Sequence, residues 1–268
     1  MTELALGIDV GGTKIAVGAV RGDGSLERLE RLPTAATTLP ELAAAAARVR
    51  DGLDAEAVGV GICEVVDDEG AIRSHESIDW TAAQLEDALG PVVLDADVRA
   101  AAVAEAQVGA GVSFASFVYV TVGTGISHTL VLDGEPYRGA HGCAQLVGSA
   151  AVEFACPHCG RRSRLSAEDV ASGSAIASGA DPAESAATLG SFLALLVNVL
   201  DPEAVVVGGG LGTAGGAYWK ALVTEVQEHV WADHVRGLPV LPAGLGADSG
   251  VIGAGLVALG AARAQEAR

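Results

Sequence analysis

A glycine pair between two apolar stretches stands close to the start of the chain, in Leu6-Gly-Ile-Asp-Val-Gly-Gly-Thr-Lys-Ile15. The apolar run before Gly11 and Gly12 predicts a buried strand, and residues 13–20 predict a second strand that returns from the turn. Because glycine lacks a Cβ atom, the backbone N–H groups of this turn can close around a phosphate, which the Thr13 hydroxyl can also contact.

Asp9 stands at the mouth of this turn. A carboxylate in that position can hold a magnesium ion through water. An ordinary β-hairpin with a glycine turn explains the same residues equally well. This stretch by itself therefore leaves both interpretations open.

The same arrangement of strand, glycine turn and strand occurs a second time. Residues 116–122 predict a strand that runs into Gly123-Thr-Gly125, and residues 129–132 predict its partner. Each occurrence leads into helical segments. The simplest architecture is an α/β fold of two similar halves with a central cleft.

The glycine and apolar patterns also place the boundary between the two halves. Helices are predicted at 40–52, 82–89, 100–108, 167–172, 183–200, 219–230 and 251–264, and further strands at 26–32, 58–62, 92–95, 204–207 and 240–243. We expect a smaller lobe formed by residues 1–112 and 251–268 and a larger lobe formed by 113–250. A single dinucleotide-binding domain is disfavoured, because no G-x-G-x-x-G follows a strand and no G-x-x-x-x-G-K-[ST] occurs.

Charge and composition restrict the partners of the chain. It has 34 acidic and 16 basic residues, for a formal net charge of −18, which disfavours binding to nucleic acid or anionic lipid. We find no run of about 18 apolar residues and no signal-peptide pattern, so a cytoplasmic protein without a membrane span is expected. Four cysteines are too few for a disulfide scaffold in a chain of 268 residues.

Four segments together predict phosphoryl transfer: Asp9-Val-Gly-Gly-Thr-Lys14, Asp95-Ala-Asp97, Thr121-Val-Gly-Thr-Gly125 and Val205-Val-Val-Gly-Gly-Gly210. The two glycine turns can hold a triphosphate, and the third glycine run lets a flat purine approach the backbone. A carboxylate that ends a strand and starts a helix can accept a proton from an attacking hydroxyl. Phosphoryl transfer needs positioning, a metal ion and a base, with little covalent chemistry.

Over nearly its whole length the chain resembles the repressor–ORF–kinase family of sugar kinases, within the actin/hexokinase superfamily. The motifs that carry the resemblance are Asp9 to Ile15, Val58-Gly-Val-Gly61, Asp97 to Glu105, Gly123-Thr-Gly-Ile126, Tyr137-Arg-Gly-Ala-His-Gly142, Asn198-Val-Leu-Asp-Pro202 and Val206-Val-Gly-Gly-Gly210. The resemblance implies a two-lobed actin-like ATPase fold, ATP and Mg²⁺ as cofactors, a homodimer, and Asp97 as the general base. It implies nucleotide contacts by Asp9, Gly11, Gly12, Thr13, Lys14, Gly123, Thr124, Gly125, Gly208, Gly209 and Gly210. The repressors of the family carry an N-terminal helix-turn-helix, whereas this sequence starts on the first strand, so a DNA-binding repressor is disfavoured.

The sugar-binding positions depart from the family pattern. The positions that correspond to the substrate-binding residues of the family are Glu64, Ser77, Ala96 and Asp97. Of these, Glu64 stands where the family has a glycine, and Ser77 and Ala96 stand where it has asparagines. The usual Glu-x-Gly-His element reads Leu146-Val-Gly-Ser149, and a second acidic sugar ligand falls at about Ser166. A hydrogen bond to a charged group contributes roughly 1.5–3 kcal/mol, so ordinary glucose is not expected to be an efficient substrate.

The zinc motif of the family is also incomplete. Family members hold Zn²⁺ with one histidine and three cysteines, whereas this chain keeps only Cys156 and Cys159 in a C-x-x-C spacing, with His158 between them. A closed zinc site needs four ligands. Zinc at these three residues and a loop with two reduced thiols both remain open.

Two functional hypotheses follow. In the first, the chain is an ATP- and Mg²⁺-dependent kinase that phosphorylates a hydroxyl of a small sugar-like substrate other than glucose. In the second, it is a pseudokinase that binds a nucleotide or metabolite as a sensor. The intact acidic residue Asp97 favours the first. Arg99, two residues further on, would not face Asp97 on a helix, and is expected to pin a neighbouring loop or to contact an anionic substrate.

Overall fold

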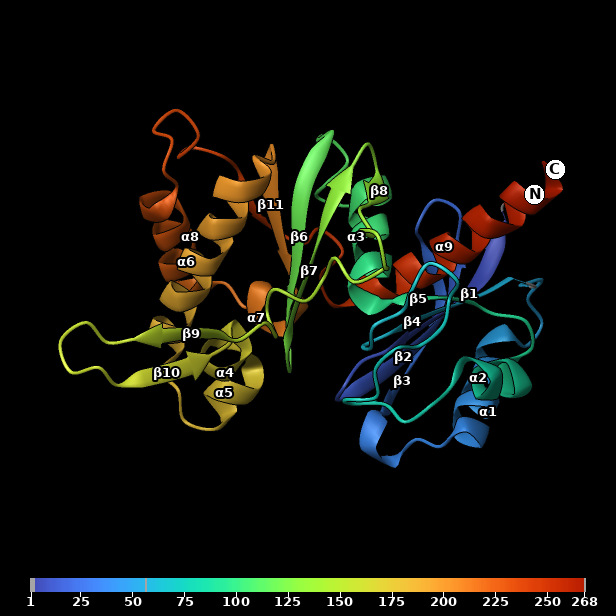
Figure 1. Cartoon of the computed structure of the whole chain (residues 1–268). Helices are drawn as coiled ribbons and strands as arrows, with labels where there is room; N and C mark the ends of the chain where they lie inside the picture. Colours follow the sequence, from blue (N-terminus) through green and yellow to red (C-terminus); the bar gives the residue numbers. More distant parts are fainter. Residues whose placement is uncertain (1–2, 56, 268) are drawn as a thin grey trace. The chain divides into compact units, whose positions relative to one another are not determined.

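The computed structural model describes residues 3–55 and 57–267. The chain forms two compact units. The first comprises Met1–Ser113, Gly134–Ala144 and Asp248–Arg268, and the second comprises Phe114–Asp133 and Gln145–Ala247. Each unit contains a β-sheet with helices packed against it (Figure 1). Both units therefore have the α/β character that the sequence predicts.

The sheet of the first unit has the strand order β3-β2-β1-β4-β5. In that order its strands are Leu26–Pro33, Lys14–Arg21, Leu4–Val10, Ala57–Ile62 and Val93–Ala96. Strand β2 pairs antiparallel with β1 and β3, whereas β4 pairs parallel with β1 and β5. Because parallel strands end at the same edge of a sheet, the residues at the carboxyl ends of β1, β4 and β5 lie along one edge.

One face of β1 carries large apolar side chains. Leu6, Ile8 and Val10 are completely buried and belong to one hydrophobic cluster with residues of α1 (Leu39–Arg50) and α2 (Ala82–Leu89). Their spacing of two places them on the same side of the strand. The sequence pattern of β1 therefore explains why α1 and α2 cover this face.

Helix α1 begins at a capping box. The side chain of Glu41 accepts the backbone N–H of Thr38 at 2.7 Å, and Pro40 lies in the first turn. The alanine-rich stretch that follows has high helix propensity. These local signals fix the start of the helix that the sequence predicts.

On the other face of the sheet, β1 and β4 carry glycines where they meet a helix. A Cβ atom built at Gly7 of β1 would lie 2.1 Å from the carbonyl oxygen of Val251, and one at Gly59 of β4 would lie 1.9 Å from that of Ala254. Both carbonyl groups belong to α9 (Ser249–Glu266). The two glycines thus let α9 lie directly on the sheet.

Helix α3 (Asp97–Val108) follows β5 without a connecting loop. It packs closely on α9, because a Cβ atom at Gly253 would lie 1.8 Å from the carbonyl oxygen of Ala100. The sequence predicts a helix from residue 100, whereas α3 begins at Asp97, directly after the extended residue Ala96. The predicted start was therefore three residues too late.

In the second unit the strands lie in the order β12-β11-β6-β7, which are Val240–Pro242, Ala204–Gly208, Ser116–Val122 and Ile126–Leu132. The two-residue strand β8 (Glu135–Pro136) belongs to the first unit. Strand β11 pairs parallel with β6 and β12, and β6 pairs antiparallel with β7. The sequence predicts the partner of β6 from Thr129, but β7 begins at Ile126. The start of β7 was missed because Ser127 and His128 are polar and interrupt the apolar pattern that was used to predict the strand.

The helices of the second unit are α4 (Ala167–Ala171), α5 (Gly173–Ala177), α6 (Pro182–Leu200), α7 (Gly209–Gly212) and α8 (Gly216–His229). Short 3₁₀ turns occur at Thr34–Ala36 and Gly246–Asp248. A hairpin of β9 (Val152–Ala155) and β10 (Arg162–Leu165), which the sequence does not predict, precedes α4.

Helix α6 is the one helix among the described residues that is long and apolar enough to cross a membrane. Its side chains Leu189 and Leu193 are buried in the core with Leu222 and Val226 of α8 and with strands β6 and β11. Core helices of globular proteins have the same length and composition. The apolar character of α6 is thus explained by its packing.

Candidate active site

The first glycine turn joins β1 to β2 in the first unit. Gly11 donates its N–H to the carbonyl oxygen of Lys14 at 3.1 Å, which closes the turn. Thr34 makes two further hydrogen bonds to this turn. Its Oγ1 donates to the carbonyl oxygen of Gly11 at 2.7 Å, and its N–H donates to the carbonyl oxygen of Thr13 at 3.0 Å. These hydrogen bonds fix the shape of the turn without a ligand.

Asp9 lies near the end of β1, beside the start of α9. A Cβ atom at Gly250 would stand 2.5 Å from Oδ2 of Asp9, so the carboxylate lies against the helix backbone. The pKa of Asp9 is raised from 3.8 to about 7, first by burial and then by the charge of Asp97, while Lys14 opposes the shift. Ionisation of a buried carboxylate is costly unless a positive charge lies beside it. Asp9 is therefore suited to be the ligand of a cation. Mg²⁺ in kinases is held by one or two carboxylates and keeps several waters.

Asp97 is the first residue of α3 and stands at the same edge of the sheet as Asp9. Its Oδ1 accepts the N–H of Val98 at 2.6 Å. The pKa of Asp97 is raised to about 6, chiefly by burial; the hydrogen bond from Val98 opposes the shift, the charge of Glu64 contributes to it, and Arg99 opposes it. A carboxylate with a pKa close to neutrality is suited to accept a proton from a hydroxyl.

Glu64 and Ala96 occupy the ends of the two neighbouring strands. Glu64 follows β4, is 4% exposed, and accepts the backbone N–H of Ser77 at 2.6 Å and of Ile78 at 2.8 Å. Although burial would raise its pKa, the hydrogen bonds lower it, beginning with that from Ser74. Ala96 is completely buried at the end of β5. The first unit thus brings three carboxylates, Asp9, Glu64 and Asp97, to one sheet edge.

Arg99 connects this edge to two loops. Its guanidinium group is fully buried and donates to Asp95 at 2.6 Å, to the carbonyl oxygen of Val66 at 2.6 Å and to that of Gly142 at 2.8 Å. Arg138 donates to the other oxygen of Asp95 at 2.5 Å. Of the two roles predicted for Arg99, the structure supports the pinning of neighbouring loops.

The second glycine turn joins β6 to β7 in the second unit. Gly123 donates to the carbonyl oxygen of Gly125 at 3.0 Å, and α5 holds the turn through Gly173, whose N–H donates to the carbonyl oxygen of Gly123 at 2.8 Å. The N–H of Ser174 donates in the same way to Thr124 at 3.3 Å. A Cβ atom at Gly123 would meet no described atom within 4 Å. The turn therefore has open space beside Gly123.

Glu168 of α4 contacts this turn and was missed in the sequence. Its Oε1 accepts the N–H of Ile126 at 2.7 Å and would stand 2.3 Å from a Cβ atom at Gly125. Its Oε2 accepts the hydroxyl of Ser149 at 2.6 Å. The capping box of α4 pairs Ser166 with Asp169 and leaves Glu168 out, so no local pattern in the sequence indicates these contacts.

The third glycine run ends β11 and starts α7. Gly208 lies against the hydroxyl of Tyr119, at 2.2 Å from a built Cβ atom, and Gly209 has a φ of +79° with Val122 close to it. Gly210, by contrast, has open space where a Cβ atom would stand. Packing alone thus explains the first two glycines, and only Gly210 has room beside it.

The cysteine pair lies in the turn of the hairpin β9–β10. The N–H of Cys156 donates to the carbonyl oxygen of Arg161 at 2.8 Å, and hydrogen bonds from the N–H groups of Cys159 and His158 and from the Cys159 thiol lower the pKa of Cys156. Among the described residues, no group of three or more His, Cys, Asp or Glu is arranged to hold a metal ion. The residues present therefore do not fit a closed four-ligand zinc site.

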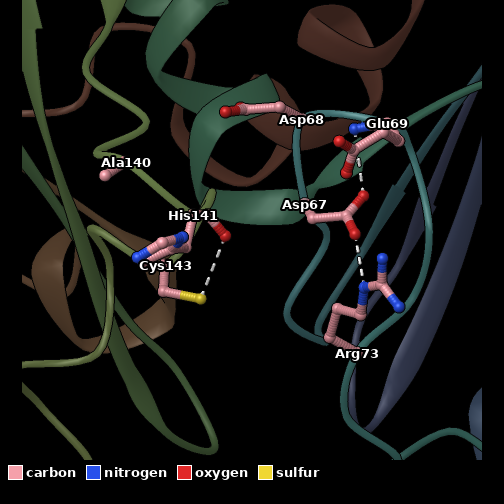
Figure 2. Close-up of a pocket in the computed structure, with 7 residues that line it drawn as sticks. All are labelled: Asp67, Asp68, Glu69, Arg73, Ala140, His141 and Cys143. Carbon is pink, nitrogen blue, oxygen red and sulfur yellow. Dashed lines mark hydrogen bonds and ion pairs between the residues drawn. The ribbon is translucent and has the colours of Figure 1, made fainter.

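A separate hollow of about 360 Å³ lies in the first unit. Figure 2 shows its lining residues Asp67, Asp68, Glu69, Arg73, Ala140, His141 and Cys143. Asp67 bonds to Arg73 and accepts the N–H of Glu69 at 3.0 Å, so its carboxylate is used within its own loop. None of the predicted catalytic or nucleotide-binding residues lines this hollow.

Comparisons with known proteins place these features in a family. A family model described as "ROK family" matches residues 5–184 and 182–261. The chain is 30% identical to N-acetylmannosamine kinase of Escherichia coli O7:K1 over 97% of this chain and 99% of that protein. It is 26% identical to glucokinase of Streptomyces coelicolor over 94% and 96% of the two chains.

Solved structures agree with the sequence comparison. The structure is similar to a ROK family glucokinase from Streptomyces griseus in complex with glucose and AMPPNP, with a TM-score of 0.85, 28% identity, and 96% and 99% of the two chains covered. It is also similar to the ROK hexokinase from Thermus thermophilus, with a TM-score of 0.76, 30% identity, and 97% and 99% covered.

The chain therefore belongs to the ROK family and has its α/β actin-like ATPase fold. The resemblance seen in the motifs is confirmed. Membership makes the chain an ATP-dependent carbohydrate kinase, a class of enzymes that uses Mg²⁺ with ATP.

Proposed function

We propose that the chain transfers the γ-phosphoryl group of ATP to a hydroxyl of a small sugar-like molecule other than ordinary glucose. The observation that carries this proposal is the position of Asp97 at the start of α3, with a pKa raised to about 6. Above that pH the carboxylate is ionised and can take the proton of the acceptor hydroxyl. Asp9 stands at the same sheet edge with a pKa of about 7, suited to a cation.

The glycine-rich segments have separate tasks in this proposal. Bound MgATP supplies the phosphoryl group and the cation that offsets its negative charge. The turn with Gly11, Gly12, Thr13 and Lys14 offers backbone N–H groups and an ammonium group to the phosphates. Gly123, Thr124 and Gly125 offer a second such turn. In the run Gly208, Gly209 and Gly210, it is Gly210 that leaves the adenosine room to approach the backbone.

The proposed kind of acceptor follows from the hydrogen-bonding side chains that are replaced at the substrate positions. The relatives named above act on N-acetylmannosamine and glucose, which supports a sugar-like acceptor. Ala96 and Ser77 offer fewer hydrogen bonds than the asparagines that the family resemblance leads one to expect, and Leu146 offers none. These replacements support an acceptor with fewer or differently placed hydroxyl groups than glucose.

ATP turnover against a panel of sugars, amino sugars and polyols tests the proposal, with Asp97→Asn as the inactive control. We expect one acceptor class to stimulate ADP release in the unchanged protein and not in the variant. The catalytic interpretation fails when no acceptor is found and Asp97→Asn leaves the residual ATPase rate unchanged.

A second function is supported by the incomplete sugar and zinc motifs. In this alternative the chain binds a nucleotide or metabolite as a sensor and transfers no phosphoryl group. Calorimetry with AMPPNP separates the cases: binding without turnover in any acceptor screen supports the sensor, and absence of nucleotide binding removes it.

Several properties of the proposed enzyme follow from the family. We infer a cytoplasmic homodimer with functional lobes at residues 1–112 plus 251–268 and at 113–250. Sedimentation analysis tests the dimer. Zinc at Cys156, Cys159 and His158 would need a fourth ligand from elsewhere, and metal analysis of the purified protein tests it.

A further inference from the structure

Glu64 is a buried carboxylate with no task in the proposed phosphoryl transfer. It lies two residues beyond the end of β4 and is 4% exposed. Buried carboxylates are costly unless hydrogen bonds satisfy them. Its partners therefore indicate what it is for.

Four donors converge on this carboxylate from one short segment. Oε1 accepts the backbone N–H of Ser77 at 2.6 Å and of Ile78 at 2.8 Å. Oε2 accepts the N–H of Glu76 at 3.0 Å and the hydroxyl of Ser74 at 2.5 Å. Residues 74–78 belong to no helix or strand of the described chain, so these bonds take the place of a regular hydrogen-bond ladder.

The segment held by Glu64 lies beside the first glycine turn. A Cβ atom built at Gly12 would be 3.8 Å from the hydroxyl oxygen of Ser77. The next residue, Ile78, is buried in the hydrophobic cluster of β1 and α1. The segment is thus anchored in the core on one side and meets the phosphate turn on the other.

We propose that Glu64 is a positioning residue, which holds residues 74–78 so that the Ser77 hydroxyl is presented to the acceptor alcohol at the first glycine turn. The inference rests on the proposed kinase function for the identity of the acceptor. A carboxylate suits this task because both of its oxygens accept hydrogen bonds. A glutamine has one such oxygen, and its amide nitrogen would meet N–H donors.

Hydrogen–deuterium exchange of the intact protein measures the hold of Glu64 on this segment. We expect the amides of residues 74–80 to exchange about tenfold faster or more in Glu64→Ala, with Glu64→Gln in between. The matched control is Glu41→Gln, which changes an exposed carboxylate that accepts the backbone N–H of Thr38. It should speed exchange only at the start of α1, and β4 should stay protected in all three variants.

Kinetics then separate positioning from direct contact. Glu64→Ala should raise the acceptor KM and lower kcat, with the KM for MgATP within about twofold. Ser77→Ala should raise the acceptor KM without changing the exchange of residues 74–80. A folded Glu64→Ala protein with unchanged exchange overturns the inference, and a loss of activity without faster exchange assigns Glu64 a direct contact instead.

The two proposals fail in different ways. Absence of phosphoryl transfer by the unchanged protein would remove the proposed function, while the exchange pattern would still decide whether Glu64 holds the segment. Should Glu64→Ala not fold, the smaller change in Glu64→Gln gives the exchange comparison, and unchanged exchange there contradicts the inference.

Discussion

The carboxylate of Asp9 lies against the backbone of Gly250, where a Cβ atom would stand 2.5 Å from Oδ2. Gly250 is the second residue of α9, so the first turn of that helix faces a carboxylate whose pKa is raised to about 7. The N–H groups at a helix start favour a negative charge. Asp9, the candidate cation ligand, is thus in direct contact with the first turn of α9.

Gly250→Ala should displace Asp9. Because the added methyl group would overlap the carboxylate, we expect kcat/KM to fall by about tenfold or more, and the thermal midpoint to drop. Gly260 lies on the same helix with no described atom within 4 Å of a built Cβ. Gly260→Ala is the control, and it should stabilise the fold by roughly 0.5–1 kcal/mol, as alanine does in a helix. Equal activity of the two variants would contradict the contact.

Asp9→Asn should stabilise the protein without ligands at alkaline pH. The folded carboxyl keeps its proton up to a pKa of about 7, whereas the unfolded one loses it near 3.8. The stability that this difference contributes is therefore complete below about pH 4 and is lost as pH rises through about 7. One pKa unit corresponds to about 1.4 kcal/mol, so the variant should gain on the order of 2–4 kcal/mol at pH 8.

Urea unfolding at pH 4 and pH 8, without Mg²⁺ or nucleotide, measures the effect of Asp9→Asn. The gain should be small at pH 4, where the unchanged carboxyl is protonated in the folded state. A loss of stability at pH 8 would show that Asp9 is well satisfied as an anion in the free protein.

The rate of phosphoryl transfer should depend on the ionisation of Asp97. Since its pKa is raised to about 6 by burial first of all, kcat/KM should rise with pH through about 6 and level off above it. Glu64→Gln removes the neighbouring charge that raises this pKa, and should move the rise to lower pH. A flat profile between pH 5 and 8 would exclude Asp97 as the base.

Gly123→Ala tests whether the second glycine turn binds a phosphate group or is only a structural turn. A methyl group at this position meets no described atom within 4 Å, so the stability should change by less than about 0.5 kcal/mol. A bound triphosphate would meet it, and we expect the KM for ATP to rise by about tenfold. Gly125→Ala is the contrasting change, because its methyl group would overlap Glu168 and should lower stability as well. An unchanged KM in Gly123→Ala argues against a phosphate at this turn.

Arg99→Met should destabilise the first unit. The substitution leaves Asp95, which is 3% exposed, with Arg138 as its remaining basic partner, and it frees the carbonyl groups of Val66 and Gly142. Removal of one partner of a buried ion pair costs about 3–5 kcal/mol. Arg138→Met removes a partner whose side chain is 39% exposed and should cost about 1 kcal/mol. Denaturant unfolding of both variants checks the order.

The sequence was sufficient for features that depend on neighbouring residues. The glycine turn after Asp9 follows from a local pattern, and so does a helix after β5, although its start was predicted three residues too late. The family resemblance, carried by motifs in the right order, is confirmed. The roles of Glu64 and Glu168 were not predictable in this way. Their partners lie about 10–14 and 19–42 residues away along the chain, and single-residue patterns carry no signal for such contacts.

Irregular segments were the hardest to predict. Each strand of the hairpin β9–β10 has only four residues, and Arg162-Ser-Arg-Leu165 is exposed and lacks the apolar alternation of a half-buried strand. Arg99 was predicted either to pin a loop or to contact an anion, and only the tertiary structure decides between them, because Val66 and Gly142 belong to two different loops.

Because α9 completes the core of the first unit, the order of synthesis matters for folding. The strands β1 to β5 leave the ribosome first, but the helix α9 that covers β1 and β4 is translated only after the whole second unit. The second unit can therefore fold while the first still exposes the glycine-lined face of β1 and β4. Nascent chains that stop before residue 248 should carry a first sheet with one face uncovered and depend on chaperones, whereas chains that include α9 should not.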